Sequence, residues 1–227
     1  MLFRTTAAMS QHIGGVILFD ETIRQKAKDG TPLVKLIEDA GAVPGIKVDA
    51  GAKKLAGSPG ETITEGLDGL RERFAAYHKL GARFAKWRAV IDIAKDIPSY
   101  NCVNANAQAL ARYAALAQEA GIVPIVEPEV LMDGDHDIAQ CEKVTGWVLE
   151  NVFSQLYYAG VVLEGIVLKP NMIVPGKKCA RQNSVEEVAA ATVRVLKRFV
   201  PGAVPGIAFL SGGQSDEDAT AHLNAIN

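Results

Sequence analysis

Short runs of β-branched and apolar residues alternate with longer helical patterns along this chain, and this alternation limits its possible folds more than any other feature. Each run begins 30 or more residues after the one before, at residues 14–19, 44–49, 84–88, 123–129, 163–170 and 206–213. Strands that alternate with helices indicate parallel strands joined by crossover helices, which is the α/β class. The spacing is close to one βα unit of a (β/α) barrel. We therefore predict a fold of the TIM-barrel type.

Local signals at the junctions support this prediction. Apolar residues at helical spacing predict helices over residues 64–80 and 104–119. A serine followed three residues later by an acidic residue, at Ser184 and at Ser215, marks two further helix starts. Four helical stretches end at a glycine suited to the left-handed C-terminal position, namely Gly41, Gly81, Gly121 and Gly160.

A doubly wound open sheet is the alternative arrangement of the same elements. The first predicted strand is not followed by a Gly-x-Gly-x-x-Gly turn, and the chain has no phosphate-binding P-loop. The dinucleotide-binding form of that fold is therefore disfavoured. No linker, charge block or low-complexity segment divides the chain, so we interpret residues 1–227 as a single domain.

The charge balance argues against two classes of partner. The chain has 24 Lys and Arg against 26 Asp and Glu, a formal net charge of −2. Nucleic-acid and membrane-surface partners usually require a basic excess, so a small molecule is the expected partner.

The sequence also indicates a cytoplasmic protein. No apolar run approaches the roughly 20 residues that a membrane span needs. The segment 1–6 lacks the pattern of a secretory signal. The cysteines are odd in number and about forty residues apart, which fits reduced, structural thiols; they are Cys102, Cys141 and Cys179.

Several predicted strands carry charged residues two apart, although buried parallel strands normally read as continuous Val, Ile and Leu. A spacing of two places side chains on one face, so the charged face would point into the barrel. Barrel enzymes place catalytic groups at these carboxyl ends of strands. Each residue alone could equally be a solvated strand end or part of a buried salt bridge, but together they predict an active site. They are Lys47 and Asp49, Lys86 and Arg88, Glu127 and Glu129, and Lys169 at the end of a fourth strand.

This set of residues is typical of Schiff-base catalysis on a phosphorylated carbonyl compound. A lysine must be neutral to attack a carbonyl, and neighbouring cations and an apolar wall favour the neutral form. Lys169 is the candidate nucleophile, with Lys86 and Arg88 as the neighbouring cations that also hold an anionic substrate. Glu127 is the candidate general acid or base for carbinolamine dehydration.

A glycine turn at the end of the last predicted strand suits a phosphate. The Ser-Gly-Gly sequence at 211–213 precedes a helix, and its backbone can approach a ligand closely and offer N–H groups. By contrast, we interpret the Gly-Lys-Lys sequence at 176–178 as a solvated turn. The four histidines show no ligand spacing, so neither a metal site nor a metal-dependent mechanism is predicted.

These residues lie in stretches that resemble class I fructose-1,6-bisphosphate aldolase, the Schiff-base-forming type. The stretches occur in the family's order along essentially the whole chain, and they read GGVILF from Gly14, GIKVD from Gly45, GLDGL from Gly66, FAKWR from Phe84, PIVEPE from Pro124, LKPNM from Leu168 and LSGGQS from Leu210. The resemblance implies a glycolytic enzyme without a metal or other cofactor. It would cleave fructose 1,6-bisphosphate reversibly into dihydroxyacetone phosphate and glyceraldehyde 3-phosphate.

The resemblance also implies a role for each site residue. Lys169 matches the family's Schiff-base lysine, and Glu127 matches its general acid/base. Lys86 matches a catalytic lysine near the scissile bond, and Glu129 a carboxylate that partners the lysines. The substrate-binding positions are Arg88, Lys47, Asp49, Ser211, Gly212 and Gly213. Family members are commonly homotetramers, so we expect a homo-oligomer acting on a phosphosugar.

Three stretches of the family pattern have no counterpart in the 227 residues. They are a Leu-Ala-Ala-Asp-Glu-Ser segment on the first strand whose aspartate assists C–C cleavage, a Ser-Tyr-Gly-Arg stretch on the eighth strand whose arginine binds phosphate, and a C-terminal tail ending in tyrosine. We therefore expect six of eight βα units, with the first and eighth strands missing. One alternative is a non-catalytic fragment or pseudoenzyme that keeps phosphosugar binding or an oligomer surface. Another is a transaldolase-like or deoxyribose-phosphate aldolase-like barrel, which the order of the motifs disfavours.

Overall fold

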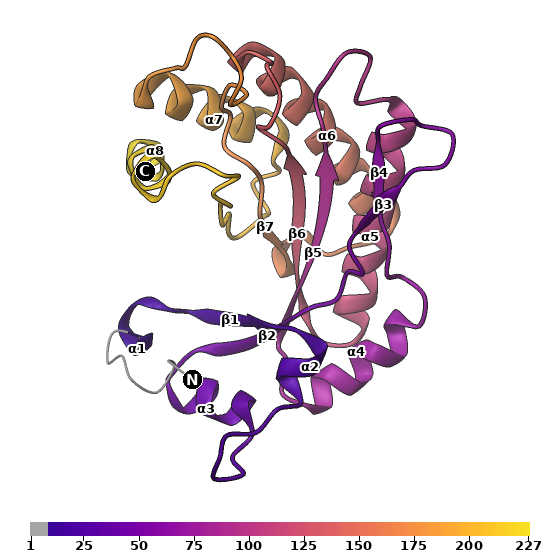
Figure 1. Cartoon of the computed structure of the whole chain (residues 1–227). Helices are drawn as coiled ribbons and strands as arrows, with labels where there is room; N and C mark the ends of the chain where they lie inside the picture. The colour runs from indigo at the N-terminus through magenta and orange to yellow at the C-terminus, as the bar shows by residue number, and fades with distance from the viewer. Residues whose placement is uncertain (1–8) are drawn as a thin grey trace.

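A twisted parallel β-sheet runs through the computed structural model, which describes residues 9–227 (Figure 1). The segment 1–6, in which the sequence shows no secretory signal, lies outside the described residues. Five strands stand side by side in chain order, each parallel to its neighbour. They are β1 (Gly15–Leu18), β2 (Val43–Lys47), β5 (Phe84–Ile91), β6 (Val123–Val130) and β7 (Val167–Leu168).

Helices connect the strands and cover one face of the sheet. The helices α4 (Leu70–Lys79), α5 (Tyr100–Glu119) and α6 (Ile138–Tyr158) pack in sequence, α4 on α5 and α5 on α6 (Figure 1). The others are α1 (Met9–His12), α2 (Asp20–Ile23), α3 (Leu33–Asp39), α7 (Val185–Phe199), α8 (Asp216–Ile226) and the short 3₁₀ helix η2 (Leu163–Gly165). No helix within residues 9–227 is long and apolar enough to cross a membrane.

The core lies between the sheet and these helices. On β5, Ala85 and Trp87 are fully buried, whereas the alternate residues Lys86 and Arg88 are only partly buried. Trp87 stacks on Tyr113 of α5, with ring centroids 5.6 Å apart. Because alternate residues of a strand point to opposite faces, the apolar residues of β5 face the helices and its cations face the other side.

The helix boundaries follow the predicted signals in most places. Ser184 caps α7 by accepting a hydrogen bond from the N–H of Glu187 at 3.3 Å, and the Glu187 carboxylate accepts from the N–H of Ser184 at 2.9 Å. Ser215 caps α8 by accepting from the N–H of Asp218 at 3.0 Å. The four glycines predicted to end helices have φ between 69° and 106°, in the left-handed region.

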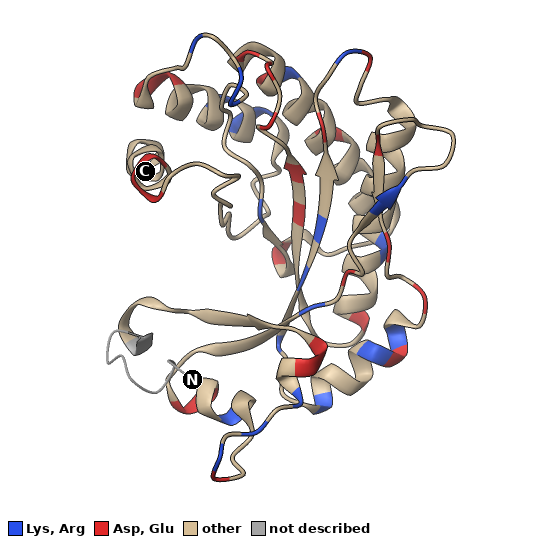
Figure 2. Ribbon diagram, in the orientation of Figure 1, with Lys and Arg blue, Asp and Glu red and all other residues tan. Residues whose placement is uncertain are grey.

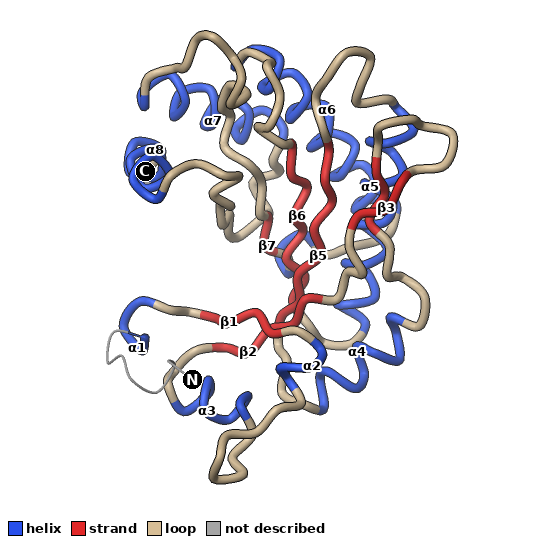
Figure 3. Tube along the Cα trace, in the orientation of Figure 1, coloured by secondary structure: helices blue, strands red, loops and turns tan. Residues whose placement is uncertain are grey.

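Two predicted strands are shorter than expected. Residues 206–213 form a loop with a single bridge, from Leu168 to Ile207 (Figure 3). The N–H of Leu168 donates to Gly206 O at 3.1 Å, and the N–H of Ala208 donates to Leu168 O at 2.9 Å. The next bond of the ladder is missing because Pro170 has no N–H to donate, and the N–H of Leu210 then donates to Pro170 O at 3.4 Å. The predicted strand over 163–170 is reduced to β7, since η2 occupies its start.

The helix predicted over residues 64–80 begins later, at Leu70. Residues Thr62–Thr64 instead form β4, which pairs antiparallel with β3 (Ala52–Lys54) in a hairpin that the sequence patterns did not predict. Gly66 and Gly69 have φ of 126° and 62°, which a right-handed helix excludes. A helix therefore cannot start before Leu70.

Two of the three free cysteines are buried, as expected for structural thiols. Burial raises the pKa of Cys102 to about 12 and that of Cys141 to about 11. Cys179 is partly exposed. At pH 8 we expect a thiol reagent such as DTNB to modify Cys179 rapidly in the folded protein, because thiolate and access are both needed for reaction. In urea all three thiols should react, and rapid reaction of all three without urea would contradict this burial.

Candidate active site

Five side chains from four neighbouring strands meet in a continuous chain of ion pairs, with Lys86 and Glu127 inside β5 and β6 rather than at the predicted carboxyl ends. Lys169 Nζ lies 2.8 Å from Glu127 Oε1, and Lys86 Nζ lies 3.2 Å from Glu127 Oε2. Lys86 Nζ also lies 3.8 Å from Asp49 Oδ2, and Lys47 Nζ lies 2.7 Å from Asp49 Oδ1. Each carboxylate therefore stands between two lysines.

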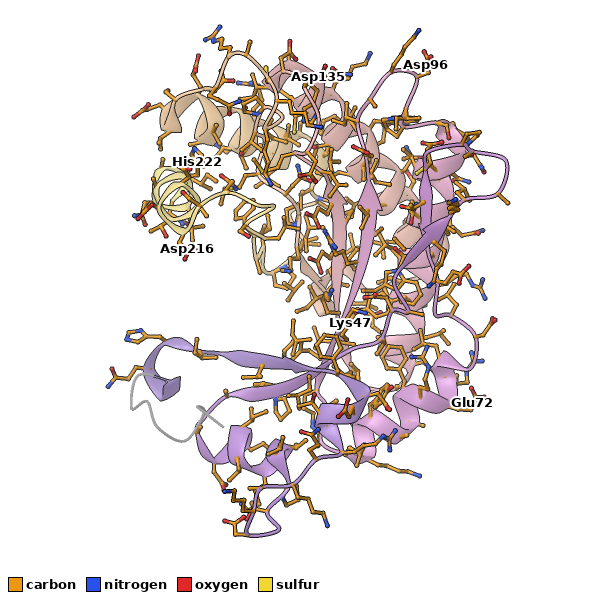
Figure 4. The ribbon with its side chains drawn as sticks, viewed as in Figure 1. Lys47, Glu72, Asp96, Asp135, Asp216 and His222 are labelled. Atoms are coloured by element: carbon orange, nitrogen blue, oxygen red, sulfur yellow. The ribbon has the colours of Figure 1, made fainter. Side chains whose placement is uncertain are left out.

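The parallel register brings these residues together. Lys47 on β2 pairs with Lys86 on β5, and Arg88 on β5 pairs with Glu127 on β6. Figure 2 shows the result as basic bands on β5 beside acidic bands on β6, and Figure 4 shows Lys47 where β2 meets this region. Lys169 follows β7, and its N–H donates to a carbonyl of β6 at 2.8 Å, which holds it beside Glu127.

The carboxylates are more deeply buried than the cations around them. The side chains of Asp49 and Glu127 are 3% and 4% exposed, whereas that of Lys169 is 24% exposed. A buried carboxylate is costly unless cations and hydrogen bonds surround it. With the pair of Arg88 and Glu129 included, four cations face three carboxylates. The cluster therefore has a formal excess of one positive charge, which suits an anionic ligand.

Arg88 and Glu129 form the second part of the cluster. Arg88 Nε donates a hydrogen bond to the buried carboxylate of Glu129, and this bond raises the pKa of Arg88. The Arg88 side chain is 42% exposed. A guanidinium has five N–H donors, so Arg88 retains donors for a ligand.

The two carboxylate oxygens of Glu127 differ in their hydrogen bonding. Its Oε1 accepts a hydrogen bond from Lys169 Nζ. Its Oε2 is buried and close to Lys86 Nζ, but accepts no well-directed hydrogen bond from any residue within 9–227. A carboxylate in this state has an unused lone pair, and can accept a further proton or hydrogen bond.

An open pocket of about 600 Å³ joins this cluster to the glycine turn. Gly212 and Gly213 have φ of 62° and 88°, and the N–H groups of residues 211–213 donate to no acceptor within the described part of the chain. Such N–H groups form anion sites. The predicted site residues that line the pocket are Arg88, Glu127, Glu129, Lys169, Ser211, Gly212 and Gly213. Lys47, Asp49 and Lys86 are not among its lining residues and join the site through their ion pairs.

Asn171 supports the site, although its type and position gave no reason to assign it a role. Its Oδ1 accepts from the N–H of Val130 at 3.0 Å, and its Nδ2 donates to Thr145 Oγ1 at 3.1 Å. These bonds fasten the segment after Lys169 to the end of β6 and to α6. Only the tertiary structure reveals this role, because both partners are distant in sequence.

The interpretation of residues 176–178 as a solvated turn holds for both lysines, which lie in a turn and are exposed, whereas Gly176 is buried. Lys177 also lines the same pocket as Lys169 and the glycine turn, and Lys178 does not. The sequence contained no signal for this difference between the two lysines, because it arises from the way two loops pack. Within residues 9–227, no three His, Cys, Asp or Glu side chains gather closely enough to hold a metal ion.

We expect Asp49→Asn to destabilise the protein by about 3 kcal/mol, the lower end of the range for a broken buried ion pair, because its lysine partners partly reach solvent. Urea unfolding measures this change. Asp39→Asn is the matched control, since Asp39 pairs with Lys35 on an exposed helix face. The control should change stability little. Equal effects of the two substitutions would contradict a structural role for the buried cluster.

Known proteins share the sequence and the fold of this chain. The family model described as fructose-bisphosphate aldolase class-I matches residues 1–227. A probable fructose-bisphosphate aldolase class 1 from Xanthomonas campestris pv. campestris is 62% identical over 226 residues, which cover 100% of this chain and 68% of the relative. The non-muscle type fructose-bisphosphate aldolase of Lethenteron camtschaticum is 55% identical over 227 residues, 100% of this chain and 62% of the relative.

A solved structure extends the match to three dimensions. A ternary complex of fructose-bisphosphate aldolase from Plasmodium falciparum with TRAP and a small-molecule inhibitor has a TM-score of 0.96 and 47% identity. The match covers 99% of this chain and 65% of that one. This likeness confirms the predicted TIM-barrel type of fold. The chain spans about two thirds of the length of the relatives it matches, and it belongs to the class I fructose-bisphosphate aldolase family.

Proposed function

We propose that this site cleaves fructose 1,6-bisphosphate reversibly into dihydroxyacetone phosphate and glyceraldehyde 3-phosphate, with Lys169 as the Schiff-base nucleophile. The observation that carries the proposal is the contact of Lys169 Nζ with Glu127 Oε1 at 2.8 Å, on the wall of a pocket that also contains the glycine turn. A nucleophile in hydrogen-bond contact with an acid/base group is the arrangement that covalent catalysis requires.

The first half of the reaction forms an iminium ion. Lys169 Nζ transfers a proton to Glu127 and attacks the C2 carbonyl carbon of the substrate. Glu127 passes that proton to the carbonyl oxygen, which becomes a carbinolamine hydroxyl, and takes a second proton from the nitrogen. Glu127 then returns a proton to that hydroxyl, which leaves as water. The Lys86 ammonium, 3.2 Å from Glu127 Oε2, stabilises the carboxylate each time it loses its proton.

The second half breaks the bond between C3 and C4. Glu127 accepts the proton of the C4 hydroxyl, the C3–C4 electron pair moves toward the iminium, and glyceraldehyde 3-phosphate leaves. The remaining enamine takes that proton from Glu127 at C3, and water hydrolyses the resulting iminium to release dihydroxyacetone phosphate and free Lys169. The iminium itself receives the electron pair, so this sequence of steps requires no metal ion.

The anionic ends of the substrate meet the positive parts of the site. We assign one phosphate to the N–H groups of residues 211–213, which are free of protein acceptors, and assign the other to Arg88. Glu129 fixes the Arg88 guanidinium through Nε and leaves its remaining donors free. Lys47 and Asp49 act as supports, because they position Lys86 through Asp49.

Reduction with borohydride tests the nucleophile directly. In the presence of dihydroxyacetone phosphate, hydride from borohydride should reduce the iminium to a stable secondary amine, and mass spectrometry of peptides should locate the label on Lys169. Lys169→Met should remove the label, and Lys178→Met should not. A label absent from the wild-type chain would overturn this assignment and favour the alternative of a phosphosugar-binding protein without catalysis.

Substitution of the acid/base group tests the proton transfers. We expect Glu127→Gln to slow aldol cleavage by roughly 10²- to 10⁴-fold, the usual contribution of a general acid/base. The measurement is turnover of fructose 1,6-bisphosphate in a coupled assay, with circular dichroism as the control for folding. Turnover within a factor of about two of wild type would assign the proton transfers to another group, since a general acid/base contributes far more.

We also propose that residues 1–227 act as one domain, in a cytoplasmic homo-oligomer of the homotetrameric kind that the resemblance implies. The continuous hydrophobic core from β1 to α7 supports the single domain. A single cooperative transition in thermal melting would support one domain. A mass of four chains in light scattering would support the homotetramer.

A further inference from the structure

Lys177 lies on the loop that follows β7, and backbone hydrogen bonds fix this loop against the loop that follows β6. Gly176 N donates to His136 O at 2.8 Å, and Lys177 N donates to Met132 O at 2.7 Å. A Cβ on Gly176 would lie only 2.2 Å from Gly134 O, so glycine at position 176 permits the close approach. The backbone of Lys177 is therefore held in place by a neighbouring loop.

The ammonium of Lys177 adjoins the glycine turn. A Cβ on Gly213 would lie 2.5 Å from Lys177 Nζ and 3.1 Å from its Cε, so the lysine occupies the space that a larger residue would need. The turn's three N–H groups have no acceptor within residues 9–227. A cation and three free donors thus line one side of the pocket, and Lys169 lines it as well.

The pairing of Lys177 leaves it available to a ligand. Its Nζ lies 3.3 Å from Asp133 Oδ1, and the two side chains are 45% and 63% exposed. An ion pair with this exposure is weak and is screened by salt. An ammonium has three N–H donors, so it can bind an anion while it stays near Asp133. The Asp133 carboxylate repels that anion and therefore opposes its binding.

We propose that Lys177 binds the phosphate of the ketone substrate together with the N–H groups of residues 211–213, and that Asp133 limits the strength of this binding. Lys177 thereby selects phosphorylated over unphosphorylated ketones. The identity of the ketone rests on the proposed function, whereas the anion site rests only on the geometry of Lys177 and the turn.

The concentration dependence of borohydride labelling tests the selectivity. Lys177→Gln removes the charge and keeps a polar side chain that is one bond shorter, and should raise the dihydroxyacetone phosphate concentration for half-maximal labelling about tenfold, corresponding to ~1.4 kcal/mol. Unphosphorylated dihydroxyacetone should label wild type and variant equally. Asp133→Asn should lower the half-maximal concentration for the phosphorylated ketone. Lys178→Gln, the matched control on the adjacent exposed residue, should leave it unchanged.

A titration with inorganic phosphate separates this proposal from the aldolase chemistry. In ¹⁵N NMR spectra, phosphate should shift the N–H signals of Gly212 and Gly213 in the wild type, with weaker binding in Lys177→Gln. If these shifts depend on Lys177 but Lys169 is not labelled, the result supports the anion site and contradicts the proposed Schiff-base chemistry. If Lys169 is labelled with the same dependence on dihydroxyacetone phosphate in wild type and Lys177→Gln, the role of Lys177 is overturned. Phosphate shifts of equal size and midpoint in both proteins would overturn it as well.

Discussion

The buried carboxylate of Glu127, held between two lysines, is the interaction on which the rest of the site depends. Burial of a carboxylate is stable only when opposite charges and donors compensate for lost water. Lys86 reaches Glu127 from β5 and Lys169 reaches it from the end of β7. Glu127 lies on the strand between them, so its burial requires that both neighbouring strands stay in register. This requirement explains how β7, with only two residues, places a side chain accurately.

The same interaction links the stability of the site to its chemistry. The lysine that compensates the buried carboxylate is also the candidate nucleophile, and their contact is the route by which a proton can leave Nζ. The second lysine, Lys86, keeps Glu127 compensated when Lys169 is engaged with a ligand. A site built from one lysine and one carboxylate would leave a buried charge unpaired at that step. Two lysines on one carboxylate avoid this cost.

Sequence alone could predict the charged site residues that lie on the strands. Charged residues two apart, such as Lys86 and Arg88, must share a face of a strand, and parallel strands present their carboxyl ends at one edge. The same pattern predicted Lys169 as a site residue, because Lys169 also ends a strand-like run. The pattern did not predict the role of Asn171 or the hairpin of β3 and β4, because both depend on partners distant in the chain.

Other errors arose where a residue's local preference was outweighed by its neighbours. The apolar run at 206–213 reads as a strand, but Pro170 in the adjoining segment cannot donate the next hydrogen bond of the ladder. The run therefore stays a loop. The N–H groups of residues 211–213 lie beyond its last hydrogen bond to the neighbouring segment, from Leu210 N to Pro170 O, and donate to no acceptor within residues 9–227.

The cluster around Glu127 and the pair of Lys177 and Asp133 differ in burial, so they should respond differently to salt. The cluster around Glu127 is buried, so dissolved ions screen it little. Lys177 and Asp133 are exposed, so ions screen their attraction for each other and for a phosphate. Backbone hydrogen bonds between two loops, rather than charge, fix the position of Lys177. Rising ionic strength should therefore weaken recognition of the phosphate while leaving the contact of Lys169 with Glu127 intact.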